Sequence, residues 1–260
     1  MEVLQEINSW VMDFNKPQIY WLSGAPGTGK TTIANAFSSK LWDAEISHVF
    51  FSCFRGDRDK LVLIFPTVAH QLANLYRDFR KKLAEVIESD PCTADVPLDN
   101  QVEKWIVSPL KQLPDQKVVI IIDALDECED KHLISEFLSA IVKSISEIPN
   151  VKFFITAGSY VEERLTKSGC ITESVLDPNM VIRRFFSTKL EESARYFLYD
   201  SPSFKEQLRP WPTKEQLDKL CKHAGGQFTE AAKIVKSFHL YGECRNPIEA
   251  LDLCLENLPC

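Results

Sequence analysis

Short apolar runs alternate with longer amphipathic stretches over the first two thirds of the chain. The apolar runs predict buried strands at Ile19–Ser23, His48–Phe54, Val118–Ile122, Val151–Thr156 and Ile171–Leu176. Stretches with helical spacing predict helices at Val3–Phe14, Lys30–Trp42, Phe65–Ser89, Val102–Leu113 and Leu133–Ile148. Strands that alternate with helices are typical of a doubly wound, mostly parallel α/β sheet, here of about five strands.

The strand pattern stops after Asp177, and helical spacing continues to the end of the chain. Helices are predicted at Val181–Tyr199, Lys214–His223, Phe228–Tyr241 and Pro247–Leu255. We therefore expect an α/β domain over residues 1–177 and a helical appendage over residues 178–260. The proline-rich stretch Ser201–Pro212 is the expected hinge within the appendage.

The first predicted strand opens into GAPGTGKT, which matches the phosphate-loop (Walker A) pattern G-x-x-x-x-G-K-S/T in full. Glycines let the backbone curl so that N–H groups point at phosphate oxygens, and the following helix adds its positive end. The expected nucleotide contacts are Gly24, Ala25, Pro26, Gly27, Thr28, Gly29, Lys30, Thr31 and Thr32. Within this set, Lys30 is expected at the β- and γ-phosphates and Thr31 at Mg²⁺.

The third predicted strand ends in a cluster of acids, VVIIIDALDECED, which spans Val118–Asp130. Acids favour helix N-termini, so by itself the run also fits a core strand followed by a solvated helix start. The phosphate loop favours a Walker B strand instead, with Asp123 as a Mg²⁺ ligand, directly or through water.

The other acids of the cluster divide into two groups. Asp126 and Glu127 are the candidate catalytic residues, because either carboxylate could orient or polarise an attacking water. The sequence does not choose between them. Glu129 and Asp130 are predicted to be solvated acids at a helix start.

Composition is that of an ordinary globular protein, with 45% apolar and 26% charged residues. The 30 basic and 37 acidic side chains give a net charge of −7, which argues against nucleic acid as the main partner. No stretch is long and apolar enough for a membrane span, and the N-terminus lacks the pattern of a signal peptide. The eight cysteines show no zinc-site spacing. We expect reduced thiols and a cytoplasmic location.

Several stretches together make the chain resemble a NACHT domain of the STAND class of signal-transducing P-loop NTPases. The resemblance is closest to the fungal branch, which includes heterokaryon-incompatibility and nephrocystin-like proteins. The family's D-small-x-D-E mark is present as Asp123, Ala124, Asp126 and Glu127. The other matching stretches, within residues 3–255, are IYWLSGAPGTGKTTIA, HVFFSCFRGDRDK, IFPTVAHQLA, VVIIIDALDEC, VKFFIT and WPTKEQLDKLCKHAGGQF.

The resemblance implies a P-loop fold of the ASCE type and a switch rather than a metabolic enzyme. Such domains bind ATP or GTP with Mg²⁺, hydrolyse it slowly, and change between a closed form and an open, oligomerising one. Effector and repeat domains usually flank them on a longer chain. Neither is present here, which is expected of a fragment, a short gene product or a decayed copy.

One departure from the family concerns the arginine that senses the γ-phosphate. The family follows its fourth strand with T-S-R-P-E, whereas this chain reads TAGSY, with Gly158 at the arginine position. Arg164 is a candidate substitute; otherwise Gly158 is an ordinary strand-ending turn. We therefore predict at most weak triphosphatase activity.

Three functions stay open at this stage. The first is a signalling switch that hydrolyses nucleotide slowly, and the second is a module that binds nucleotide or a protein partner but barely turns over. The third is an ordinary phosphate-loop kinase or GTPase, which would need an acceptor lid or a guanine-reading N-K-x-D motif. The Asn15–Lys16 pair continues into Pro17–Gln18 and does not make that motif.

Overall fold

The computed structural model describes residues 2–54, 60–89, 97–113, 116–128, 130–158, 171–198, 211–242 and 246–258. The chain divides into two compact units. The sheet unit is Glu2–Ser23 with Lys30–Val175, and the helical unit is Gly24–Gly29 with Leu176–Cys260 and Met1.

The centre of the sheet unit is a five-stranded sheet in the order β2-β3-β4-β1-β5. Every neighbouring pair is parallel, which confirms the predicted doubly wound α/β fold. The strands are β1 (Ile19–Ser23), β2 (His48–Ser52), β3 (Val118–Asp123), β4 (Val151–Ala157) and β5 (Ile171–Val175). Strands β1, β3 and β4 are buried along their whole length, as expected for strands covered on both faces.

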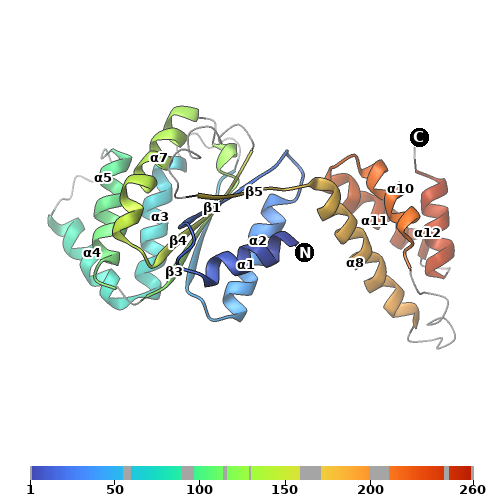
Figure 1. Cartoon of the computed structure of the whole chain (residues 1–260), viewed down its shortest axis with the longest axis horizontal. Helices are drawn as coiled ribbons and strands as arrows, with labels where there is room; N and C mark the ends of the chain where they lie inside the picture. The colour runs from blue at the N-terminus through green and yellow to red at the C-terminus, as the bar shows by residue number, and fades with distance from the viewer. Residues whose placement is uncertain are drawn as a thin grey trace. The chain divides into compact units, whose positions relative to one another are not determined.

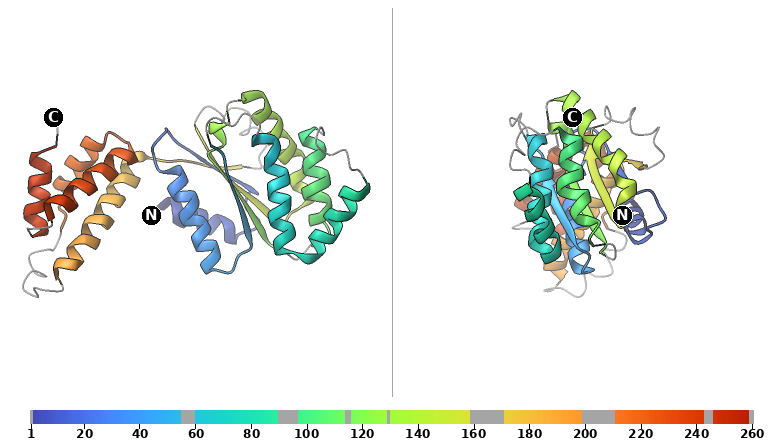
Figure 2. Two further views of the ribbon diagram at one scale, coloured as in Figure 1. Left: turned by 180° about the vertical axis from the view of Figure 1, so that it is seen from behind. Right: turned by 90° about the vertical axis from the view of Figure 1, so that its left-hand side faces the viewer.

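Helices cover both faces of this sheet (Figure 1). One face carries α1 (Glu2–Met12) and α2 (Lys30–Asp43), and the view from behind shows the same arrangement (Figure 2). The other face carries α3 (Lys60–Leu75), α4 (Arg77–Ser89), α5 (Leu98–Val102) and α7 (Lys131–Ser144). Side chains alternate between the faces, so Phe154 packs on Phe37 of α2 while Phe153 and Ile155 join the opposite core.

Two predicted helices are wrong in their extent. The stretch Phe65–Ser89 is not one helix, because α3 begins at Lys60, contains Pro66 in its interior, and is followed by a separate α4. At the junction, Tyr76 N–H still bonds to Leu72 O and Arg80 N–H to Tyr76 O. Helical backbone hydrogen bonds therefore continue across the break, which is why the boundary at Tyr76 was not predicted.

The stretch Val102–Leu113 is the second case. It contains the end of α5, a π-helical turn over Glu103–Val107, and the short α6 (Ser108–Leu110). The π turn buries three consecutive apolar residues, Trp105, Ile106 and Val107. A regular α-helix would rotate one of them away from the core, so the wider turn follows from this apolar triplet.

Strand β2 lies at one edge of the sheet, where its outward backbone groups need partners. The side-chain amide of Gln71 in α3 supplies them. It accepts from Phe50 N–H and donates to Phe50 O, each at 2.9 Å. One side chain thus replaces a missing neighbouring strand at this position.

A fully buried lysine joins α1 to the sheet. Lys152 of β4 is 0% exposed, and its Nζ donates to the carbonyls of Trp10 and Asp13, each at 2.7 Å. The ammonium also lies 4.7 Å from the ring centre of Trp10 and 5.0 Å from that of Phe14. It therefore satisfies carbonyls at the C-terminal end of α1, where a helix favours positive charge.

The helical unit contains α8 (Pro178–Leu198), α10 (Lys214–Ala224), α11 (Phe228–Gly242) and α12 (Pro247–Glu256). Its core includes Phe186, Leu190, Leu220, Phe238 and Leu251, all nearly inaccessible to solvent. Helix α10 begins with a capping box between Thr213 and Gln216 and ends at Gly225 in the left-handed conformation. These signals explain why the predicted boundaries of α10 fall within one residue of the observed ones.

The buried Lys152 generates a prediction about pH. Burial lowers its pKa from the ordinary 10.5 to about 8, with a smaller opposing effect of Asp13. Between these values the unfolded chain binds more protons than the folded one, so the free energy of unfolding should rise with pH. Denaturant titrations should show the difference between wild type and Lys152→Met growing by about 2 kcal/mol from pH 8 to pH 10. A difference that stays flat or falls would contradict the assignment.

Candidate functional site

The glycine loop Gly24–Gly29 has the backbone that a phosphate cradle needs. Gly27 and Gly29 adopt φ of 78° and 94°, which side chains of other residues rarely tolerate. A Cβ on Gly24 would lie 2.8 Å from Thr28 Oγ1, which itself donates to Ala25 O at 2.8 Å. The glycines at these three positions are therefore required by the shape of the loop.

Within the helical unit, the loop is held by the start of α11. Phe228 N–H donates to Gly27 O at 2.6 Å. A Cβ on Gly29 would touch Phe228 and Val181, each at 3.4 Å. Ala25, Pro26 and Gly27 remain exposed, whereas Thr28 is buried.

Helix α2 begins directly after the loop and presents three predicted site residues. Lys30 is 9% exposed, while Thr31 and Thr32 are exposed in the first turn. Asn35 Nδ2 donates to the backbone carbonyl of Thr31 at 2.9 Å, and Thr31 itself lies in the exposed first turn. A hydroxyl there is a hard oxygen ligand of the kind that Mg²⁺ prefers.

Asp123 lies at the carboxyl end of β3 and is 0% exposed. Two hydroxyls donate to its carboxylate from the neighbouring strands. Thr156 Oγ1 of β4 lies 2.7 Å from Oδ1, and Ser52 Oγ of β2 lies 3.3 Å from Oδ2. An ionised carboxylate has about four lone-pair directions, so two donors leave acceptor capacity for a metal ion or a metal-bound water. The Asp123 carboxylate therefore fits a Mg²⁺ site.

The acidic turn after β3 carries the two candidate catalytic carboxylates. Ala124 adopts the left-handed conformation, with φ 55° and ψ 43°, and a 3₁₀ turn follows over Leu125–Glu127. Leu125 is 0% exposed and anchors the turn in the core, while Asp126 and Glu127 are half-buried. The buried leucine thus anchors the turn that places Asp126 and Glu127 after Asp123.

The remaining predicted residues lie elsewhere. Asp130 caps α7, because its Oδ1 accepts from His132 N–H at 2.9 Å and Leu133 N–H at 3.1 Å, which confirms its helix-start role. Gly158 is buried directly after β4. The residues considered at the sequence level that lie outside the described residues are Arg55, Arg58, Glu129 and Arg164.

Two thiols lie beside the carboxylates. Cys53 and Cys128 are both buried, and their side chains hydrogen-bond to each other. The hydrogen bond with Cys128 and burial raise the pKa of the Cys53 thiol, and Asp123 and Asp126 add to this effect. Cys53 is therefore held as a neutral thiol, which is a poor nucleophile and a poor metal ligand.

Sequence reasoning missed Ser52 and Thr156, although a signal for them exists. Four strands of this sheet have a polar residue at or near the carboxyl end: Ser23, Ser52, Asp123 and Thr156. Carboxyl ends of parallel strands lie at the same end of a sheet, so these polar residues are expected to lie close together there. The register pairs Ser52 with Asp123 directly.

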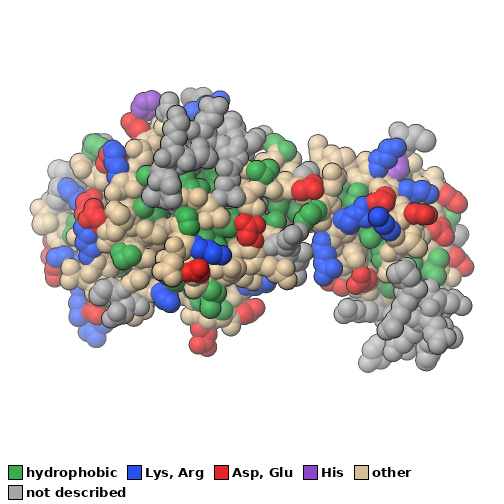
Figure 3. Space-filling model, viewed as in Figure 1, with side chains coloured by type: hydrophobic (Ala, Val, Ile, Leu, Met, Phe, Trp, Pro, Cys, Tyr) green, Lys and Arg blue, Asp and Glu red, His purple; other side chains and the backbone are tan. Residues whose placement is uncertain are grey.

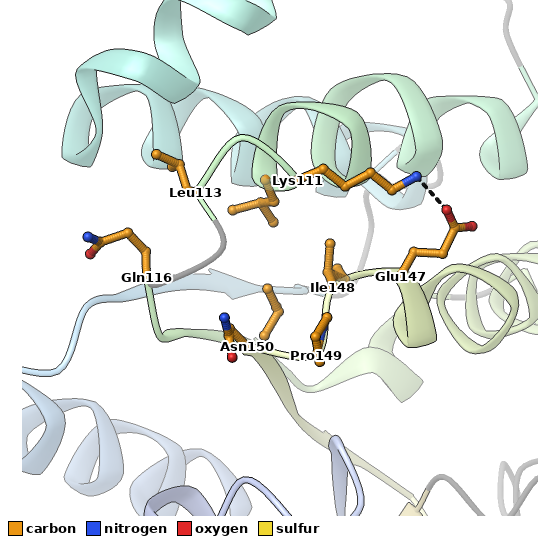
Figure 4. A pocket seen from close by; sticks show the side chains of 9 residues that line it. Lys111, Leu113, Gln116, Glu147, Ile148, Pro149 and Asn150 are labelled. Atoms are coloured by element: carbon orange, nitrogen blue, oxygen red, sulfur yellow. Dashed lines mark hydrogen bonds and ion pairs between the residues drawn. The ribbon is translucent and has the colours of Figure 1, made fainter.

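A pocket of about 140 Å³ lies at the opposite edge, near the amino ends of β3 and β4. Figure 4 shows Leu113, Gln116 and Asn150 around it, with an ion pair between Lys111 and Glu147 at one side. Pockets for small molecules usually measure at least about 300 Å³. Its size and place separate it from the predicted nucleotide site.

A comparison with protein-family models matches residues 3–157 to the model described as nephrocystin 3, N-terminal. The match covers more than half of the chain, including the loop, Asp123 and Thr156. The chain belongs to the nephrocystin 3 N-terminal family. A comparison with curated proteins found no match.

Solved structures share the fold of this nephrocystin 3 N-terminal family member at low identity. PCH-2 from C. elegans aligns with a TM-score of 0.51 and 16% identity, over 98% of this chain and 67% of that one. The ORC1 protein of Aeropyrum pernix, in complex with DNA, aligns with a TM-score of 0.52 and 15% identity, over 96% and 63%. These similarities support the P-loop ATPase fold.

The described surface and helices add three observations on this nephrocystin 3 N-terminal family member. Acidic and basic side chains are interspersed over the face of the sheet unit in Figure 3. None of the described helices combines the length and apolar character that a membrane span requires. Among the described residues, no three His, Cys, Asp or Glu side chains are arranged to hold a metal ion together.

The structure predicts different roles for Asp123 and Asp130, which are seven positions apart. Asp123→Asn should weaken nucleotide binding in Mg²⁺ at least tenfold, about 1.4 kcal/mol, and change binding in EDTA much less. Asp130→Ala is the matched control; it should lower the free energy of unfolding by about 1 kcal/mol and leave the Mg²⁺ effect intact. Calorimetric titration and denaturant unfolding measure the two quantities. Equal losses with and without Mg²⁺ in Asp123→Asn would rule out a metal role.

Proposed function

We propose that this chain is a nucleotide-binding switch of the NACHT/STAND type, related to the fungal branch. It binds ATP or GTP with Mg²⁺ and hydrolyses it slowly. Residues 1–177 form the nucleotide-binding domain, and residues 178–260 form a helical appendage. The proposal places the protein in the cytoplasm, as a homo-oligomer or beside effector and repeat domains on a longer chain.

The observation that supports this proposal most is the order of the central strands. The glycine loop follows β1, Asp123 ends β3, and β4 lies between them. In open α/β sheets, ligands bind at the carboxyl ends of the strands. The exposed Thr31 belongs to α2, and α2 contacts β3, the strand that carries Asp123. Phosphate groups and Mg²⁺ suit the glycine loop and these oxygen ligands respectively.

Each group of residues has a separate role in the proposed nucleotide site. Backbone N–H groups of Gly24–Gly29 and the ammonium of Lys30 would bind the phosphates. The Thr31 hydroxyl and the Asp123 carboxylate would hold Mg²⁺, which neutralises charge on the phosphate oxygens when bound. Asp126 or Glu127 would orient the attacking water and accept its proton.

Gly158 favours a second candidate, a module that binds nucleotide but hardly hydrolyses it. Charge builds on the γ-phosphoryl oxygens in the transition state, and a positioned arginine can stabilise it. The buried Gly158 has no side chain to contribute there. Both candidates share nucleotide binding and differ only in the rate of turnover.

The net charge of −7 does not favour a nucleic-acid partner. The A. pernix ORC1 structure contains DNA. At 15% identity this likeness concerns the fold. We therefore propose a nucleoside triphosphate, rather than DNA, as the ligand of this chain.

Replacing Lys30 tests the proposed function. Lys30→Ala should raise the Kd for a fluorescent ATP analogue about thirtyfold, because it removes a contact worth about 2 kcal/mol between an ammonium and phosphate. Lys40→Ala, in the last turn of the same helix, should bind like wild type. Circular-dichroism melts without nucleotide check that both variants fold.

The same proteins decide between the two candidates. Single-turnover assays of wild type should show slow hydrolysis for a switch and hardly any hydrolysis for a binding module. Lys30→Ala affinity equal to that of wild type would remove the phosphate assignment. Turnover at a rate typical of an efficient ATPase would remove the role given to Gly158.

A further inference from the structure

We propose that Thr156 is the positioning residue of this site, because its hydroxyl holds both the Asp123 carboxylate and the turn that carries Asp126 and Glu127. The inference deepens the proposed function and rests on it for the meaning of the site. Its first test, however, needs no nucleotide.

The directions of the two hydrogen bonds follow from the chemistry of the groups. Thr156 Oγ1 lies 2.7 Å from Asp123 Oδ1 and 2.9 Å from Ala124 N. A backbone N–H can only donate and an ionised carboxylate can only accept. The single hydroxyl proton of Thr156 is therefore directed at Asp123, and one of its lone pairs is occupied by Ala124. One side chain fixes two consecutive residues.

Ala124 needs such a restraint. Its left-handed backbone, with φ 55° and ψ 43°, is unfavourable for an alanine. Such conformations persist where surrounding contacts determine them, and they are frequent at functional sites. Glu127 N–H bonds to Ala124 O at 2.9 Å, so the orientation of Ala124 sets the start of the acidic turn. A change at Ala124 would be passed on to Asp126 and Glu127.

Ser52 plays a smaller part. Its hydroxyl lies 3.3 Å from Asp123 Oδ2, which is longer than the usual distance for a hydrogen bond between oxygens, and it belongs to the edge strand β2. Thr156 is 0% exposed in β4, with a strand on each side. The two hydroxyls therefore differ in bond length and in the position of their strands in the sheet, and Ser52→Ala is the milder comparison.

A purely structural role would predict another pattern of effects. If the hydroxyl only satisfied buried polar groups, its loss would lower stability without changing Mg²⁺ dependence. A positioning role predicts a local change in the turn and a selective loss of the Mg²⁺ effect. Thr156→Ser keeps the hydroxyl and should restore both, whereas Thr156→Val keeps the shape and removes the hydroxyl.

The first experiment measures amide hydrogen exchange in the nucleotide-free protein. In Thr156→Val, exchange over Ala124–Cys128 should become at least tenfold faster, while Thr156→Ser and Ser52→Ala stay close to wild type. If Thr156→Val does not fold by circular dichroism, Thr156→Ala replaces it. Unchanged exchange in a folded variant without the hydroxyl would overturn the proposal.

The second experiment measures nucleotide affinity in Mg²⁺ and in EDTA. The ratio of the two affinities should fall at least fivefold in Thr156→Val and stay unchanged in Thr156→Ser. Adding Ala124→Gly, which tolerates the left-handed backbone, should restore part of the single-turnover rate lost in Thr156→Val but not the Mg²⁺ ratio. A Thr156→Val protein with the wild-type ratio would overturn the role of the hydroxyl at Asp123.

The two proposals can fail separately. If wild type binds no nucleotide in either buffer, the proposed function is wrong, and the exchange experiment alone decides whether Thr156 holds the turn. If wild type binds with a clear Mg²⁺ effect and Thr156→Val behaves identically, only the positioning role is wrong.

Discussion

A buried carboxylate at the end of β3 is the constraint on which the site depends. Asp123 is 0% exposed, and a charge removed from water must receive hydrogen bonds or a cation. The neighbouring strands meet this demand with two hydroxyls, from Thr156 and Ser52. The parallel order β2-β3-β4 brings the three side chains together at the carboxyl ends of their strands. The topology of the sheet therefore supplies the hydrogen-bond donors that the buried carboxylate needs. The proposed Mg²⁺ would meet the same need through the remaining acceptor capacity of the carboxylate.

Strand β4 carries a polar side chain with hydrogen-bond partners near each of its ends, Lys152 and Thr156. Lys152, Phe154 and Thr156 alternate along it and face the same side. Lys152 binds the carbonyls at the end of α1, Phe154 packs on α2 through Phe37, and Thr156 holds Asp123. A buried cation and a buried anion thus lie on one face of the central strands, each with its own partners. This arrangement explains why a strand of seven residues carries two polar side chains within a buried sheet.

The sequence predicted the class of fold and most element boundaries, because the signals were local and complete. The phosphate-loop motif, the apolar strands and the capping residues of α10 each act within a few positions. The failures involve information that is not local. The π turn at Glu103–Val107 depends on which residues the core must bury. The hydrogen bonds from Ser52 and Thr156 to Asp123 depend on the register of three strands. The roles given to Gly24–Thr32, Asp126 and Glu127 remain predictions from their motifs.

The most direct test of the account is a calorimetric titration of the wild-type chain with a slowly hydrolysed ATP or GTP analogue, with Mg²⁺ and with EDTA. We expect one site per chain and an affinity at least tenfold higher in Mg²⁺, because Asp123 and Thr31 contribute only when the cation is bound. Binding that does not depend on Mg²⁺ would contradict the proposed role of the Asp123 carboxylate as a Mg²⁺ ligand. No binding in either buffer would contradict the nucleotide site itself.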